Sequence, residues 1–140
     1  MAQRMMFINL AVKDLERSRR FFQELGFAFD PRFSDEKATC MVVSDQCLVM
    51  LLTDAFFRSF TRREPCDTSR ATEVMLAVSA ESRVSVDAFA DRALAVGAAS
   101  AMPPQDHGFM YGRSFYDPDG HHWEVAWMDP AALTSGPPKD

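Results

Sequence analysis

A short hydrophobic stretch occurs twice in this chain, and each copy opens the same series of hydrophobic and polar patterns. Residues 8–12 read Ile-Asn-Leu-Ala-Val, and residues 74–78, roughly half the chain later, read Val-Met-Leu-Ala-Val. A polar bend and an amphipathic helix pattern follow each copy, ending at Leu25-Gly26 and at Val96-Gly97. A single long-period repeat of this kind indicates two copies of one supersecondary unit.

The first copy predicts the element order β-α-β-β-β. Residues 6–12 have the pattern of a buried strand. Asp14 is a good cap for the helix that follows, and Gly26 is a typical residue for ending it. Apolar runs bounded by turn residues then predict three more strands, at residues 27–33, 38–43 and 47–53.

The second copy predicts a strand at residues 73–78 and a helix capped by Ser82 or Ser85. The same pattern predicts a short strand at 99–102. Two longer strands, at 111–116 and 122–128, are joined by Asp-Pro-Asp-Gly, a strong turn sequence. The second copy therefore repeats the order of the first.

These patterns predict an α+β fold with two paired β-α-β-β-β modules, which form a curved mixed sheet around a cavity and carry the helices on the other face. A chain of 140 residues is one domain by length. The expected divisions are module 1 at about 5–53, a linker with a short amphipathic helix at 54–70, module 2 at about 71–129, and a frayed tail at 130–140.

Strand periodicity sorts the side chains between the two faces of the sheet. The more apolar set of each strand is expected under the helices, which leaves the alternate positions for the cavity. The side chains expected to face the cavity include Phe7, Asn9, Glu73, Met75, His122 and Glu124. A cavity between two repeated halves is the expected place for a small-molecule site.

Composition narrows the class of partner. The net charge is −5 and no basic stripe is present, which argues against nucleic acid. No apolar run approaches the length that spans a bilayer, so a membrane is not an expected partner. Three cysteines without CxxC spacing are typical of reduced thiols, so we expect the protein in the cytoplasm.

Two motifs carry a family resemblance. Residues 12–18, Val-Lys-Asp-Leu-Glu-Arg-Ser, with Phe21-Phe22 and Leu25-Gly26-Phe27, resemble the opening of the vicinal-oxygen-chelate superfamily. The run Asp-Pro-Asp-Gly at 117–120, followed by Trp-Glu-Val at 123–125, resembles its ending. This superfamily includes glyoxalase I, bleomycin-resistance proteins and extradiol dioxygenases.

Residues 106–115 and 127–130 further resemble a bacterial subgroup labelled as predicted lactoylglutathione lyases. The resemblance covers roughly residues 5–129 and implies the paired-module fold. It also implies a homodimer in which modules of two chains complete each other's cavities, and a small-molecule ligand.

The resemblance also implies four metal-ligand positions, which fall on Phe7, about Leu51, Glu73 and Glu124. Such sites hold one divalent ion, Ni, Zn, Mn or Fe(II), depending on the ligand set. Phe7 and Leu51 cannot bind a metal, so only the two glutamates remain, with His122 as a possible replacement ligand. The expected cofactor is therefore either none or one divalent metal.

Glu73 and Glu124 are the candidate catalytic residues. If they lie close together, one pKa rises, and that carboxylate could act as a general base beside a carbonyl. Each could equally be a structural carboxylate paired with a neighbour such as Arg113. The residues expected to bind or line the ligand are Phe7, Asn9, Leu51, Met75, His107, Tyr111, Arg113 and His122.

The function favoured by these residues is that of a small-molecule protein of the glyoxalase/bleomycin-resistance type, lyase-like if it is an enzyme. The alternative is a non-catalytic protein that sequesters an apolar or aromatic compound. A metal-dependent dioxygenase ranks third, because its two-histidine, one-carboxylate triad cannot be assembled from Phe7, Glu73 and Glu124.

Overall fold

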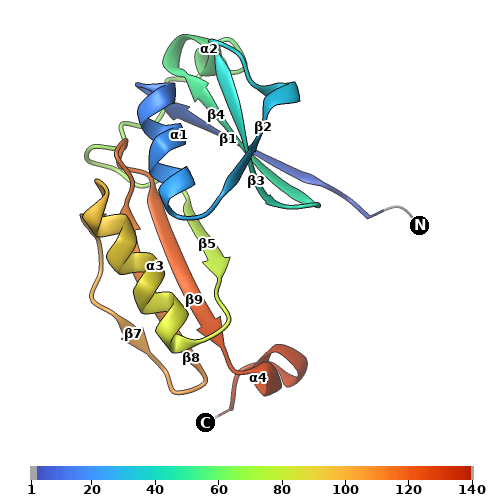
Figure 1. Cartoon of the computed structure of the whole chain (residues 1–140), viewed down its shortest axis with the longest axis vertical. Coiled ribbons are helices and arrows are strands. Elements are labelled where there is room, and N and C mark those ends of the chain that lie inside the picture. Colours follow the sequence, from blue (N-terminus) through green and yellow to red (C-terminus); the bar gives the residue numbers. More distant parts are fainter. Residues whose placement is uncertain (1–2, 140) are drawn as a thin grey trace. The chain divides into compact units, whose positions relative to one another are not determined.

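The computed structural model describes residues 3–139 and divides into two compact units (Figure 1). The first unit comprises Met1–Asp67 and the second Thr68–Asp140, so their boundary falls within the segment expected to link the modules. The predicted α+β architecture is confirmed, with one mixed sheet in each unit and helices packed on it. No helix in the described part of the chain is long and apolar enough to cross a membrane.

The first unit holds a four-stranded sheet in the order β1-β4-β3-β2. Strand β1 runs parallel to β4, and the other neighbours are antiparallel. Helix α1 packs on β3 and β4 (Figure 1). The elements are β1 (Met6–Val12), α1 (Leu15–Glu24), β2 (Ala28–Asp30), the 3-10 helix η1 (Pro31–Phe33), β3 (Ala38–Ser44), β4 (Cys47–Thr53) and α2 (Asp54–Arg58).

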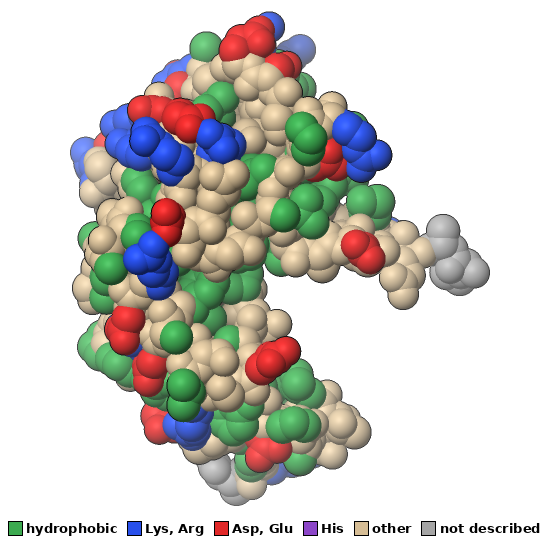
Figure 2. Space-filling model, viewed as in Figure 1, with side chains coloured by type: hydrophobic (Ala, Val, Ile, Leu, Met, Phe, Trp, Pro, Cys, Tyr) green, Lys and Arg blue, Asp and Glu red, His purple; other side chains and the backbone are tan. Residues whose placement is uncertain are grey.

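Helix α1 forms where the sequence pattern predicts it. The Asp14 side chain accepts a hydrogen bond from the Arg17 backbone N–H at 3.1 Å, which satisfies one free donor of the first turn. Gly26 follows the helix with φ of 97°, a left-handed conformation that favours glycine. Acidic and basic side chains both lie on the exposed face of this helix (Figure 2), where Arg19 pairs with Glu16.

The predicted strand at residues 27–33 is wrong in its second half. Only Ala28–Asp30 pairs with β3, and η1 follows directly. Pro31 has no backbone N–H to give to a sheet, and the Asp30 side chain accepts a hydrogen bond from the Arg32 N–H at 2.9 Å. The Asp-Pro pair therefore ends the strand and caps a helical turn.

The second unit holds a mixed sheet in the order β5-β9-β8-β6, with β7 also paired to β8. Strands β5 and β9 are parallel, as β1 and β4 are in the first unit. The elements are β5 (Met75–Ser79), α3 (Arg83–Ala95), β6 (Ala99–Ser100), β7 (Gln105–Asp106), β8 (Met110–Tyr116), β9 (His122–Met128) and α4 (Pro130–Ser135).

Helix α3 covers one face of this sheet. Ser82, one of the two predicted caps, accepts a hydrogen bond from the Ser85 backbone N–H at 3.0 Å. Val86 and Ala90 are buried against Val125 of β9, and this contact forms the core of the unit. Trp123 is buried on the same strand face, as the alternation along β9 predicts.

The Asp-Pro-Asp-Gly turn between β8 and β9 is organised by a buried carboxylate. Asp117 accepts hydrogen bonds from Trp123 Nε1 at 2.9 Å and from the Asp119 and His121 backbone N–H groups. Burial raises the pKa of the Asp117 carboxyl. The Thr68 hydroxyl donates to the Asp119 carbonyl oxygen at 2.5 Å, which fixes the start of the second unit against the turn.

Two element boundaries differ from the prediction. The expected frayed tail begins instead with α4, because Asp129 caps it, Pro130 occupies its first turn, and Ala132 is buried. The strand predicted to begin at Glu73 begins at Met75, and Val74 is exposed. Residues 73 and 74 therefore lie outside the sheet.

Candidate ligand-binding site

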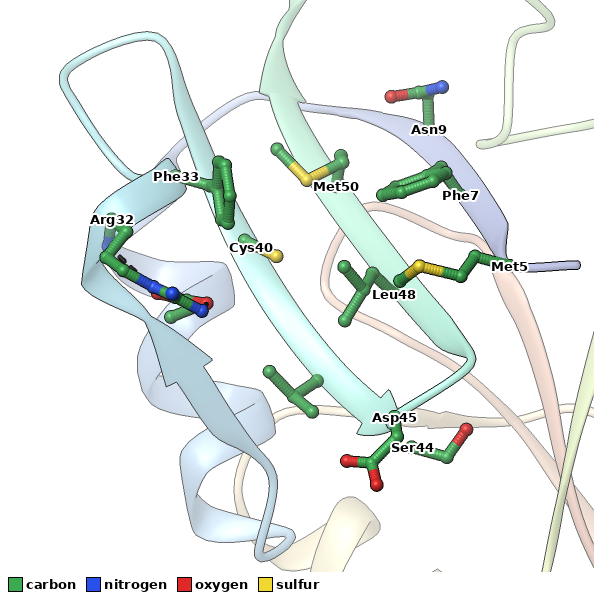
Figure 3. Close-up of a pocket in the computed structure, with 12 residues that line it drawn as sticks. Met5, Phe7, Asn9, Arg32, Phe33, Cys40, Ser44, Asp45, Leu48 and Met50 are labelled. Atoms are coloured by element: carbon green, nitrogen blue, oxygen red, sulfur yellow. Dashed lines mark hydrogen bonds and ion pairs between the residues drawn. The ribbon is translucent and has the colours of Figure 1, made fainter. Parts of the chain in front are cut away.

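A pocket of about 600 Å³ lies on the face of the first sheet that α1 does not cover (Figure 3). It is lined entirely by residues of the first unit. The apolar lining residues are Met5, Phe7, Phe33, Cys40, Val42, Leu48 and Met50. The polar ones are Asn9, Asp30, Arg32, Ser44 and Asp45.

The floor of the pocket comes from alternate positions of three neighbouring strands. Phe7 pairs with Leu48 across the parallel β1–β4 ladder, and Asn9 pairs with Met50. Cys40 pairs with Met50 on the antiparallel side. Since paired residues project to the same face of a sheet, these side chains form one continuous surface that is apolar except at Asn9.

Two aromatic rings stand at the edges of this floor. Phe7 is 58% exposed and Phe33 is 56% exposed, both unusually accessible for phenylalanine. Figure 3 shows Met50 between them, with its thioether on the same side of the sheet. The arrangement offers two rings and a polarizable sulfur to a flat apolar molecule.

Arg32 and Asp30 form the charged edge of the pocket. Arg32 Nε donates to Asp30 Oδ1 at 3.1 Å, and Arg32 Nη2 donates to Asp30 Oδ2 at 2.8 Å. These hydrogen bonds hold the pKa of Asp30 below its usual range. The guanidinium also lies over the Phe33 ring, 5.5 Å from its centroid, so its plane is fixed by two kinds of contact.

The Cys40 thiol lies in the pocket floor and is fully buried by its neighbours. Burial raises the pKa of this thiol, and the nearby Asp30 carboxylate adds to the effect. A neutral thiol behaves as a small apolar group, so Cys40 contributes to the apolar floor.

The sequence-predicted residues of the first module divide between the two faces of the sheet. Phe7 and Asn9 lie in the pocket lining. Leu51 does not: it pairs with Leu10 on the face covered by α1 and is 0% exposed. The prediction that Leu51 faces the cavity is therefore wrong by one strand position.

Met50 and Leu48 are the pocket residues of β4 that sequence reasoning missed. The sequence alone held no signal for them, because β4 is apolar at almost every position. The parallel pairing of β1 with β4 places each residue of β4 on the face of its β1 partner. Phe33 and Arg32 were missed because residues 31–33 were expected to continue a strand. Only the capped turn brings them to the pocket.

In the second unit, His122 and Glu124 lie on the sheet face that α3 does not cover. His122 is 7% exposed, and its Nε2 atom has no hydrogen-bond partner among the described residues. Glu124 Oε1 lies 3.8 Å from that atom, beyond hydrogen-bond distance. The Tyr116 ring meets the imidazole edge-on, with 5.4 Å between centroids.

Glu73 does not join this pair. In the β5–β9 ladder Met75 is opposite His122 and Ala77 is opposite Glu124. Glu73 precedes the strand, lies in a bend and is exposed. The expected neighbouring of Glu73 and Glu124 is therefore wrong, because the parallel register places Ala77 opposite Glu124 and leaves Glu73 before the start of the strand. Met75 is exposed beside His122, on the predicted face.

Tyr111 and Arg113 lie on the opposite face of β8 from the one predicted. The Tyr111 hydroxyl donates to Asp87 Oδ1 at 2.6 Å, and Arg113 Nη1 donates to Asp91 Oδ1 at 2.7 Å. Both aspartates belong to α3, so the two side chains fasten this helix to the sheet. Tyr111 and Arg113 lie four and two residues before Phe115, which is buried. This spacing places all three side chains on the same face of β8, and it was the signal for this role.

His107 is exposed in the turn between β7 and β8. Its backbone N–H donates to the Met110 carbonyl oxygen at 2.8 Å, which closes the turn. It is not among the residues that line the pocket of the first sheet.

No group of three or more histidine, cysteine, aspartate or glutamate side chains within residues 3–139 is arranged to hold a metal ion. The donors that do come near each other on one sheet face are His122 and Glu124. One imidazole and one carboxylate do not by themselves fix the geometry that a transition metal requires.

Comparison with known proteins adds a fold relationship. A family described as bleomycin resistance protein-like N-terminal matches residues 4–44. No curated protein matches the chain. A solved structure of the hypothetical protein SA1046 from S. aureus is 29% identical, with 91% of this chain and 95% of that chain covered and a TM-score of 0.76.

Two further structures have similar folds at lower identity. A glyoxalase-related enzyme from Fulvimarina pelagi is 22% identical over 90% of this chain and 88% of that chain, with a TM-score of 0.75. The fosfomycin resistance protein FosX from Listeria monocytogenes, complexed with Mn(II) and sulfate, is 19% identical. The match covers 96% of this chain and 98% of that chain, with a TM-score of 0.70.

Proposed function

Because the chain has the fold of the vicinal-oxygen-chelate superfamily, we propose that it binds a small, mainly apolar aromatic molecule in the pocket of the first sheet. The observation that carries this proposal is the exposed apolar floor between Phe7 and Phe33. A pocket of about 600 Å³ is within the range that accommodates drug-sized molecules.

The exposed rings explain why a ligand is favoured there. Phe7 and Phe33 leave more than half of their surface in water, and Met50 lies between them. A flat ligand would remove this surface from water, at about 25 cal/mol for each Å² of apolar area. This exposed apolar surface therefore supports sequestration of an aromatic compound.

A second candidate function is lyase-like proton transfer in the second unit. It is favoured by the buried His122 imidazole, whose Nε2 atom faces the Glu124 carboxylate at 3.8 Å without a hydrogen bond. The Glu124 side chain is 43% exposed, so its carboxylate can take a proton from a group that binds beside it, while the buried imidazole lies behind it. Glu124 is then the candidate base, and His122 is the candidate orienting group.

A ligand screen separates the two functions. The panel contains neutral aromatic compounds and the hemithioacetal of methylglyoxal and glutathione. Sequestration predicts saturable aromatic binding, seen as a thermal shift that grows with ligand concentration, without turnover. Turnover that falls in Glu124→Gln while substrate binding is kept would instead support the lyase-like function. Absence of aromatic binding in every assay would contradict the first proposal.

A divalent metal is a cofactor to be tested, since the FosX relative was crystallised with Mn(II). The donors in the described residues do not fit a complete site, because the positions expected to supply two ligands carry Phe7 and an apolar residue of β4. We expect protein purified without chelator to hold well under one equivalent of Ni, Zn, Mn or Fe by elemental analysis. Stoichiometric metal that is lost in Glu124→Ala would contradict this.

Two further parts of the proposal rest on resemblance and composition. The homodimer follows from the usual assembly of two-module chains in this superfamily, and sedimentation analysis of the purified protein tests it. Cytoplasmic localisation is proposed on composition, since the three cysteines lack CxxC spacing.

A further inference from the structure

Arg32 is held in one orientation at the edge of the pocket. Its Nε and Nη2 atoms donate to the two carboxylate oxygens of Asp30, and its plane lies over Phe33. Asp30 is in turn fixed as the cap of η1 by the Arg32 backbone N–H, and its side chain is mostly buried. The guanidinium is therefore positioned before any ligand arrives.

Only one hydrogen-bonding edge of this guanidinium is occupied. An arginine has five N–H donors, and the pair formed by Nε and Nη2 is the edge that contacts Asp30. The other edge, formed by Nη1 and the second N–H of Nη2, has no hydrogen-bond partner among the described residues. Arg32 is 79% exposed, so this edge is accessible. Its two parallel N–H groups match the geometry of a carboxylate.

The remaining acidic group of the pocket lies at the other end. Asp30 pairs with Cys40 in the sheet, whereas Asp45 follows the last residue of β3. Asp45 lies five residues further along the chain than Cys40, roughly 16 Å at about 3.3 Å per residue. An anionic ligand group is therefore attracted at the Arg32 end and repelled at the Asp45 end, which gives the ligand one orientation.

We propose that the pocket selects aromatic carboxylates, with the ring on the Phe33–Met50 surface and the carboxylate on the free edge of Arg32. This inference rests on the proposed function and names its ligand class. The carboxylate would accept hydrogen bonds from Nη1 and Nη2, while Asp30 keeps Nε and the other N–H of Nη2.

The test compares two probes of equal size, 2-naphthoate and neutral 2-naphthalenemethanol, by titration calorimetry at low ionic strength. The unaltered protein should bind 2-naphthoate roughly tenfold more tightly, because charge-assisted hydrogen bonds are the stronger kind. Arg32→Gln should remove this preference, because it weakens 2-naphthoate binding far more than 2-naphthalenemethanol binding. Folding of each variant is checked by its thermal unfolding midpoint.

Asp30→Asn is the converse of Arg32→Gln and should raise the affinity for 2-naphthoate. The asparagine keeps a side-chain oxygen to cap η1 but no longer neutralises Arg32, so 2-naphthoate should bind several-fold more tightly. Equal affinity for the two probes, or equal weakening of both in Arg32→Gln, would overturn the carboxylate preference and leave the proposed function standing. If neither probe binds, both the preference and the proposed function are wrong.

Discussion

Met50→Glu should weaken the binding of a neutral aromatic probe by about a hundredfold, because a carboxylate without a partner must lose its hydration under the ligand. Met50 lies between Phe33 and Phe7 in the pocket floor, and glutamate has nearly the same length and shape (Figure 3). A loss of affinity in this variant would therefore result from the charge placed in the pocket floor and not from a change in side-chain size. Calorimetric titration with 2-naphthalenemethanol measures it.

Two control variants accompany this change. Met50→Leu keeps the floor apolar and should retain most of the affinity. Met102→Glu introduces the same charge at an exposed position in the second unit and should leave binding unchanged. If Met50→Glu binds the probe as well as Met50→Leu does, the pocket of the first sheet is not the aromatic site.

Gly120→Ala should lower the free energy of unfolding by about 3 kcal/mol or more, because backbone strain and a steric overlap act together. Gly120 has a φ of 88°, and a Cβ atom there would overlap the Thr68 carbonyl oxygen. Thr68 cannot easily move away, since its hydroxyl donates to the Asp119 carbonyl oxygen in the same turn. Urea denaturation followed by circular dichroism measures the change.

Gly26→Ala is the matched control for this prediction. Gly26 has a similar φ of 97°, but a Cβ atom there would meet nothing within 4 Å. It should therefore lose only about 1 kcal/mol, the cost of a left-handed conformation for a residue with a side chain. Similar losses in the two variants would show that the contact between Thr68 and the turn does not constrain Gly120.

The sequence by itself determined most of the secondary structure and the two-module plan. Asp14 and Gly26 bound the first helix, and the hydrophobic alternation in residues 122–128 identified a strand with one buried face. These features depend on neighbours within one turn of helix or one strand, so local patterns contain the information. The two copies of the strand motif, at residues 8–12 and 74–78, likewise predicted the two modules.

The position of the site was decided by tertiary structure. Leu51 and Met50 are both apolar, and only the register between β1 and β4 shows which of them faces the pocket. Tyr111 and Arg113 were predicted to bind a ligand. In the folded chain their side chains instead donate hydrogen bonds to Asp87 and Asp91 of α3. Because a shift of one residue along a strand moves a side chain to the other face, a site on a sheet depends on pairing between distant segments.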